Sequence, residues 1–278
     1  MKKSNLIQDV VDAASNRRSF VRKLGIASAA VGAAGTLGLQ TASAQTATDV
    51  NVLNFALNLE FLEAEFYTVA TTGKTLEASG LNVGTNPGPT MGGNQVTFSN
   101  SLVFTSAVAL EIANDERTHV KLLQTALGGA AISKPTINLN ALGFGFGSQN
   151  DFLKLARIFE DIGVTAYAGA APLLSSAVIG TAARILAAEA EHVANIRLQI
   201  ARLNIPTAPP LDGADSLPPP SNPNQFFSLN ANSLSETRTP GQVLYLAYGN
   251  MANATGGGFF PDGVNGYYKT STSAATAD

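Results

Sequence analysis

Four stretches of the chain place apolar side chains every three or four residues, which is the spacing of an amphipathic helix. They cover about residues 49–70, 99–127, 151–171 and 175–203. Helix-breaking residues follow each stretch, at Gly73, Gly128, Pro172 and Pro206. The pattern predicts an all-α protein whose main domain, residues 45–204, is a four-helix bundle.

The segments between and after these helices are rich in glycine and proline. Residues 73–98 cannot sustain a helix and are predicted to form a long crossover or lid, and residues 130–148 form a second connection. Residues 205–223 hold seven prolines and predict an extended connector. The tail that completes residues 205–278 is expected to cover the bundle with a short helix near 240–248 and an aromatic-rich loop over 256–268.

Residues 1–44 differ from the rest of the chain. They contain Arg17 and Arg18, a small-residue apolar run over 24–39, and the sequence Ala-Ser-Ala at 42–44. This is the layout of an export signal, and its twin-arginine string resembles signals that pass folded proteins. We expect a periplasmic or secreted protein. A retained N-terminal anchor is the alternative, although the run is short for a membrane span.

Composition limits the chemistry. The chain has no cysteine, so thiolate catalysis and iron–sulfur clusters are excluded, and any metal must be bound by oxygen and imidazole nitrogen. The net charge of the whole chain is −3. Residues 1–44 hold more basic than acidic side chains, so the net charge of the remaining residues is more negative than −3. We therefore expect no nucleic-acid partner and no stable membrane span after signal removal. Homodimer formation is left open.

Both histidines of the chain lie three residues after a glutamate, in the pairs Glu116/His119 and Glu189/His192. The chance of both pairings arising at random is about one in a thousand. Positions i and i+3 share one face of a helix, so each pair directs a carboxylate and an imidazole to the same point. Each pair therefore supplies half of a two-metal site.

The other two helices each place one glutamate in an apolar stripe, Glu60 and Glu160, and each glutamate is followed seven residues later by a tyrosine, Tyr67 and Tyr167. Glu63 competes with Glu60 as the ligand from the first helix, and the spacing to Tyr67 favours Glu60. No catalytic residue beyond the ligands is predicted, and the tyrosines are expected to contact the ligands by hydrogen bonds. We interpret the neighbouring acids as solvated or as outer groups around the ligands: Glu65, Glu111, Asp115, Asp161 and Glu191.

This pattern resembles the ferritin-like domain family, which includes plant desiccation-related proteins. The similar segments are residues 53–67, 111–124, 160–174 and 257–266. The resemblance implies a dinuclear centre of two iron or two manganese ions. In it, Glu116 and Glu189 would bridge the ions. Glu60 and Glu160 would be terminal ligands, and His119 and His192 would complete the set.

Such a centre favours an oxidoreductase that acts on dioxygen or hydrogen peroxide, in the range from ferroxidase to catalase. The resemblance adds a protective role under oxidative or drying stress. Two alternatives stay open. One is a structural or metal-binding stress protein without turnover, whose site would be closed to solvent. The other is a metal-free bundle, in which Glu116→Ala would stabilise the fold by removing a buried charge.

Overall fold

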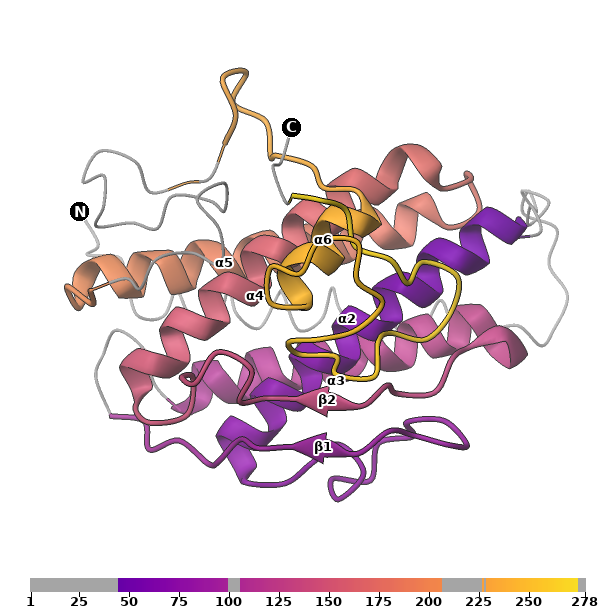
Figure 1. Ribbon diagram of the computed structural model, residues 1–278. Coiled ribbons are helices and arrows are strands. Elements are labelled where there is room, and N and C mark those ends of the chain that lie inside the picture. The colour runs from indigo at the N-terminus through magenta and orange to yellow at the C-terminus, as the bar shows by residue number, and fades with distance from the viewer. Residues whose placement is uncertain (1–44, 100–105, 207–226, 228, 275–278) are drawn as a thin grey trace, which may run out of the picture. The chain divides into compact units, whose positions relative to one another are not determined.

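The computed structural model describes residues 45–99, 106–206, 227 and 229–274 (Figure 1). The predicted export signal over 1–44 and most of the proline-rich connector lie outside these residues. The described residues belong to one compact unit.

Four long helices form the bundle: α2 (Ala47–Thr72), α3 (Ser106–Leu127), α4 (Gln149–Ala170) and α5 (Ile179–Arg202). The helices pack chiefly as two pairs, α2 with α3 and α4 with α5, and α2 also contacts α4. Buried aliphatic and aromatic side chains from all four helices form one continuous core. The predicted all-α, ferritin-like fold is confirmed.

One predicted helix start is wrong. The start of α3 falls beside residues outside the described part of the chain: Ser99 is not helical, and the first described residue of α3 is Ser106. The prediction placed the start of the fourth helix at Ser175, but α5 begins at Ile179. Ser175 instead donates its backbone N–H and its hydroxyl to the Asp49 carboxylate, both at 2.8 Å. Because Asp49 also closes the capping box with Thr46 at the start of α2, this one carboxylate joins two helix ends.

The two connections meet outside the bundle. A two-residue strand in the first, β1 (Thr90–Met91), pairs in parallel with β2 (Ile137–Asn138) in the second. Single 3₁₀ turns, η1 (Gly128–Ala130) and η2 (Ala171–Leu173), follow α3 and α4. The crossover is therefore ordered by backbone pairing without a helix of its own.

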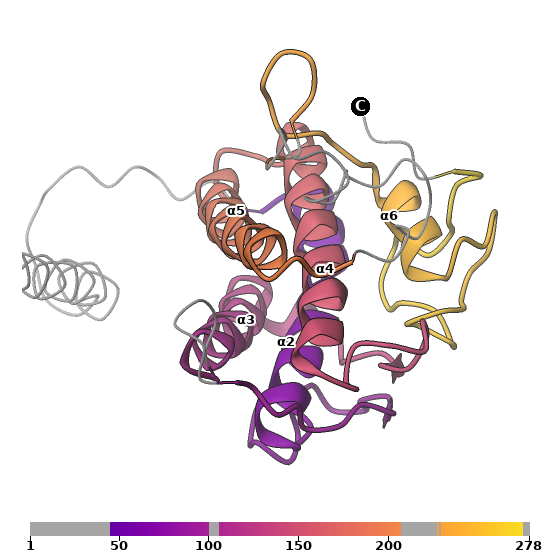
Figure 2. The same ribbon diagram turned by 90° about the vertical axis from the view of Figure 1, so that its left-hand side faces the viewer.

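The tail begins with α6 (Pro240–Ala247), whose first turn is capped by Thr239. Figure 2 shows α6 and the following loop beside α4, on the side away from α3 and α5. Asn58 of α2 and Asn265 of the tail exchange two hydrogen bonds of 2.9 Å. Aromatic side chains of the tail, including Phe259 and Phe260, are buried in the common core. No helix among the described residues has the length and apolar character required to cross a membrane.

Candidate metal centre

The structure brings the six predicted ligands together at the middle of the bundle. The four glutamates are fully buried and the two histidines are 8% exposed. Each helix supplies its share from one face: α2 and α4 give one glutamate each, and α3 and α5 give the Glu-x-x-His pairs. The residues are Glu60, Glu116, His119, Glu160, Glu189 and His192.

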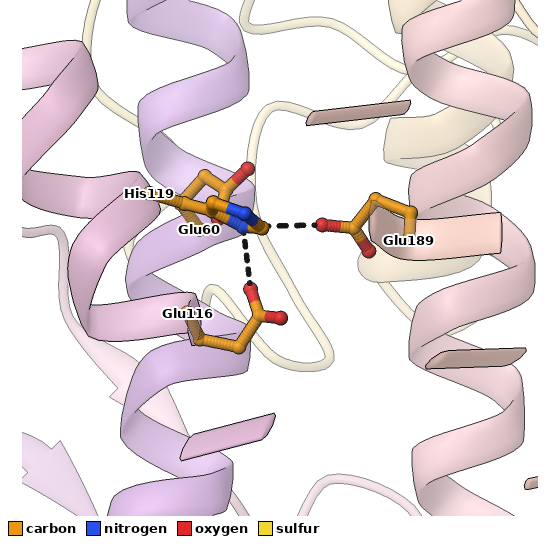
Figure 3. Close-up of side chains that lie close together, drawn as sticks. All are labelled: Glu60, Glu116, His119 and Glu189. Atoms are coloured by element: carbon orange, nitrogen blue, oxygen red, sulfur yellow. Dashed lines mark hydrogen bonds and ion pairs between the residues drawn. The ribbon is translucent and has the colours of Figure 1, made fainter. Parts of the chain in front are cut away.

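His119 lies among three carboxylates from three helices. Its Nδ1 atom is 3.3 Å from Glu60 Oε2, 3.3 Å from Glu116 Oε2 and 3.4 Å from Glu189 Oε1. Figure 3 shows Glu116 on the same helix as the histidine and Glu189 approaching from another helix. One imidazole nitrogen and three carboxylate oxygens thus converge on one small volume.

His192 has a matching environment. Its Nδ1 atom is 3.1 Å from Glu116 Oε1 and 3.2 Å from Glu160 Oε2. Its other nitrogen, Nε2, is 3.3 Å from Asp115 Oδ2. A carboxylate at Nε2 keeps that nitrogen protonated and leaves Nδ1 free to bind a metal ion.

Potential ligand atoms fall into two groups of four, and within each group they lie within 4.8 Å of one another. The first group contains Glu60 and His119, and the second contains Glu160 and His192. Glu116 and Glu189 belong to both groups. Two overlapping sites that share two carboxylates have the donor set of a dinuclear centre with bridging glutamates.

The two tyrosines connect the groups across the bundle. Tyr167 of α4 donates its hydroxyl to Glu60 Oε1 at 2.5 Å, and Tyr67 of α2 donates to Glu160 Oε1. Each tyrosine therefore orients the glutamate of the other helix. Both phenols are buried and face carboxylates, and burial and the negative charge of these glutamates raise the phenol pKa well above the usual value.

The electrostatics show how the cluster is held together without a metal. Burial would lower the pKa of His119 and His192, but the surrounding carboxylates raise it far above the usual value. Both imidazoles are therefore protonated on both nitrogens and positively charged. Burial would raise the pKa of Glu116, but hydrogen bonds with both histidines lower it to about 2. Burial raises the pKa of Glu60 to about 7 and that of Glu189 well above 4.5.

The donor set has a deficit that metal ions would correct. Four buried carboxylate oxygens lack a well-formed hydrogen bond among the described residues: Glu60 Oε2, Glu116 Oε1, Glu189 Oε1 and Glu189 Oε2. The first three lie 3.1–3.4 Å from a histidine Nδ1, whereas Glu189 Oε2 has no such neighbour. Buried polar atoms are normally satisfied, and an unpaired buried charge is costly. All four belong to the two groups of potential ligands, so the residues fit a pair of divalent cations.

Glu63, the alternative ligand from α2, does not join either group. It is nevertheless buried, with 4% of its surface exposed. Burial and the charge of Glu189 raise its pKa well above the usual value. The geometry therefore favours Glu60 as the ligand and leaves a further carboxyl group in the same interior.

Glu65 and Asp161, which we expected to be solvated or outer groups around the ligands, are instead buried beside cations. Glu65 is fully buried, where it accepts the Leu76 N–H and lies 3.9 Å from Lys134 Nζ. Asp161 is 3% exposed and pairs with Arg157 and Arg197. Both acids are buried because a cation from another part of the fold is buried beside them.

Two hollows lie beside the centre, between α3 and α5. One, of about 240 Å³, is lined by His192 and by three acids, Glu111, Asp115 and Glu191. The other, of about 300 Å³, is lined by His119 and Arg184. Each hollow therefore borders one histidine of the centre.

Four helices that direct glutamates and Glu-x-x-His pairs inward define the ferritin-like class of bundles. Comparison with known sequences agrees with the geometry. The ferritin-like domain family matches residues 48–202, which is more than half of the chain, so the chain belongs to this family. The predicted family is confirmed, whereas the twin-arginine-like signal stays a prediction.

Two curated relatives carry informative names. The "Ferritin-like catalase Nec2" of Nesocodon mauritianus is 23% identical over 269 residues, which cover 78% of this chain and 84% of that protein. The "Desiccation-related protein PCC13-62" of Craterostigma plantagineum is 30% identical over 168 residues, which cover 54% of this chain and 52% of that protein. One name describes peroxide chemistry and the other describes drying stress.

Proposed function

We propose that this chain is a dinuclear iron or manganese carboxylate protein that acts as an oxidoreductase on hydrogen peroxide or dioxygen. The observation that carries the proposal is the pair of overlapping four-residue groups that share Glu116 and Glu189. The name of the catalase relative favours peroxide as the reactant. The desiccation-related relative supports a protective role under stress.

Each ligand has a defined task in this proposal. Glu116 and Glu189 would be shared by the two ions, Glu60 with His119 would complete one site, and Glu160 with His192 would complete the other. Bound there, two such ions would supply the two-electron redox chemistry that disproportionates peroxide to water and dioxygen.

Protein groups around the ligands hold them in position. The phenols of Tyr67 and Tyr167 fix one oxygen of Glu160 and Glu60, so that the second oxygen of each faces the centre. Asp115 holds the His192 ring through Nε2. Preorganised ligands of this kind avoid the cost of ordering side chains when an ion binds.

The alternative is a metal site that stabilises the fold without turnover. The hollows beside His119 and His192 oppose it, because a purely structural site is closed. The leading proposal predicts dioxygen release from hydrogen peroxide by the metal-loaded protein, measured with an oxygen electrode. It also predicts loss of that activity in Glu116→Gln and retention in Asp262→Asn, a control that removes an exposed carboxylate. Metal-loaded protein that releases no dioxygen and consumes none would support the structural alternative.

The sequence of residues 1–44 supports a proposal about where the protein works. We propose that residues 1–44 direct export, so that the mature protein acts in the periplasm or outside the cell. Export of the folded chain would allow metal to be loaded before transport. Cell fractionation of the full chain beside an Arg17→Lys/Arg18→Lys variant tests this, and equal export of both would contradict a twin-arginine route.

A further inference from the structure

Glu63 is a buried carboxylate that the six-ligand centre does not use. It lies on α2, one turn after Glu60, and is 4% exposed. Among the described residues, no hydrogen bond or ion pair satisfies its carboxylate. A buried carboxyl group without a partner is costly, so its presence in the middle of a bundle requires a role.

Glycine at position 163 places the Glu63 carboxylate next to the centre. A Cβ atom at Gly163 of α4 would lie 3.2 Å from Glu63 Oε1 and 2.8 Å from Glu189 Oε2. Both carboxylates therefore reach the same space beside α4. This space exists because residue 163 has no side chain. Since Glu189 is shared by both groups of ligands, Glu63 lies beside a carboxylate that contacts both sites.

An apolar cavity of about 20 Å³ is lined by Glu63 and by the same Gly163. This is enough for a molecule about the size of water. Its wall comes from α2 and α4, and its roof comes from α6 and the tail. Glu63 is the only charged residue among those that line it: Leu59, Leu62, Glu63, Phe159, Ile162, Gly163, Val243, Ala247 and Phe259.

The cavity and the hollows lie on different sides of the bundle. The hollows beside His119 and His192 are lined by residues of α3 and α5, whereas the cavity is lined by α2, α4 and α6. The hollows carry charged side chains and suit ions and water. The cavity is apolar except for Glu63 and suits a small neutral molecule.

We propose that Glu63 is a seventh ligand of the metal centre, which binds one ion from the side of this cavity. The space beside Gly163 gives the side chain room to turn toward the ion. This inference rests on the proposed function because it requires bound metal.

Two substitutions separate ligation from a simple effect of charge. Glu63→Gln keeps the size of the side chain and removes the charge, whereas Glu63→Asp keeps the charge and shortens the reach by one methylene. Glu65→Gln is the matched control, because it removes another buried carboxylate two residues further along α2 that accepts the Leu76 N–H. The probe is Mn²⁺, titrated into metal-stripped protein by calorimetry and followed by the electron paramagnetic resonance spectrum of the bound ions.

If Glu63 is a ligand, the dissociation constant of one Mn²⁺ rises at least about tenfold in both Glu63 variants. The spectrum of the bound ions also changes, while Glu65→Gln retains wild-type affinity. Gly163→Ala would place a Cβ atom 3.2 Å from Glu63 Oε1 and 2.8 Å from Glu189 Oε2. It crowds both carboxylates, so weaker Mn²⁺ binding in this variant is expected but supports the assignment only together with the Glu63 variants.

Three results would overturn the assignment while leaving the proposed function in place. These are wild-type binding in both Glu63 variants, wild-type binding in Glu63→Asp alone, or an equal loss in the Glu65→Gln control. Wild-type affinity in Gly163→Ala would also count against it. Failure of the wild-type protein to bind Mn²⁺ or Fe²⁺ would instead refute the proposed function itself.

Discussion

The most informative substitution in the metal-free protein is Glu189→Gln. Glu189 is fully buried; its Oε1 lies 3.4 Å from His119 Nδ1, and its Oε2 has no hydrogen-bond partner among the described residues. Burial and the charges of Glu116 and Glu160 raise its pKa well above 4.5. Between the ordinary pKa and the raised pKa, the folded state therefore keeps a proton that the unfolded state has released.

The magnitude follows from this proton. A raised carboxyl pKa means that the folded state loses stability as the pH rises above the ordinary pKa. Each pH unit is worth about 1.36 kcal/mol, so holding the proton from pH 4.5 to pH 7 costs at most about 3 kcal/mol. Glutamine has the shape of the neutral acid and removes this cost. At about 2–4 °C per kcal/mol for a chain of this size, the metal-free variant should melt up to about 6–12 °C higher.

With bound metal, the wild-type protein is expected to be more stable than Glu189→Gln. Two ions, each present at about 100 times its dissociation constant, stabilise the wild-type protein by about 5 kcal/mol in total. Glu189→Gln loses a ligand to both ions and with it most of this gain. The assay is thermal unfolding of both proteins from pH 5 to pH 7.5, with a chelator and then with Mn²⁺.

Two results would refute this reasoning. One is a metal-free variant that melts at or below the wild-type temperature at pH 7, and the other is an equal rise with Mn²⁺ in both proteins. Glu116 is not suitable for the same test. Since Glu116 accepts hydrogen bonds from both protonated histidines, Glu116→Ala would leave two buried cations with one anion fewer. It is expected to destabilise even a metal-free bundle.

Three further predictions concern protons, orientation and helix capping. A metal ion must displace the Nδ1 protons of His119 and His192, so the Mn²⁺ affinity should fall as the pH is lowered. Calorimetry in buffers of different ionisation enthalpy should show proton release, and equal binding heats in all buffers would contradict this. Asp115→Asn should weaken the binding of one Mn²⁺ ion about 10–100-fold, because the His192 ring loses the carboxylate that orients it. An unchanged dissociation constant in a titration would show that Asp115 does not orient the ring. Thr46→Ala should lower the free energy of unfolding by about 1 kcal/mol by removing the α2 cap, and an unshifted urea midpoint would contradict the capping assignment.

The helices and the candidate ligands could be predicted from the sequence because both depend on local spacing. Apolar periodicity locates the four helices, and the distance of three residues in Glu-x-x-His places both side chains on one face. Glu60 and Glu160 could be selected because each is a carboxylate inside an apolar stripe.

The remaining features depend on contacts between distant residues. The late start of α5 follows from hydrogen bonds between Ser175 and Asp49, which are 126 residues apart. Asp115 contacts His192 across 77 residues. No local pattern shows that Asp161 is buried, because the fold brings Arg197 to it from another helix. Glu63 could be recognised as a competing ligand, but its position beside Gly163 required the structure.

The most direct test of the central claim is elemental analysis of the protein purified from its own export route, beside a His119→Ala/His192→Ala variant. The account predicts about two iron or manganese ions per chain in the wild-type protein and their loss in the variant, with the helical content unchanged. Fewer than about 0.1 ion per chain in a folded wild-type protein would contradict it, because a dinuclear centre requires about two.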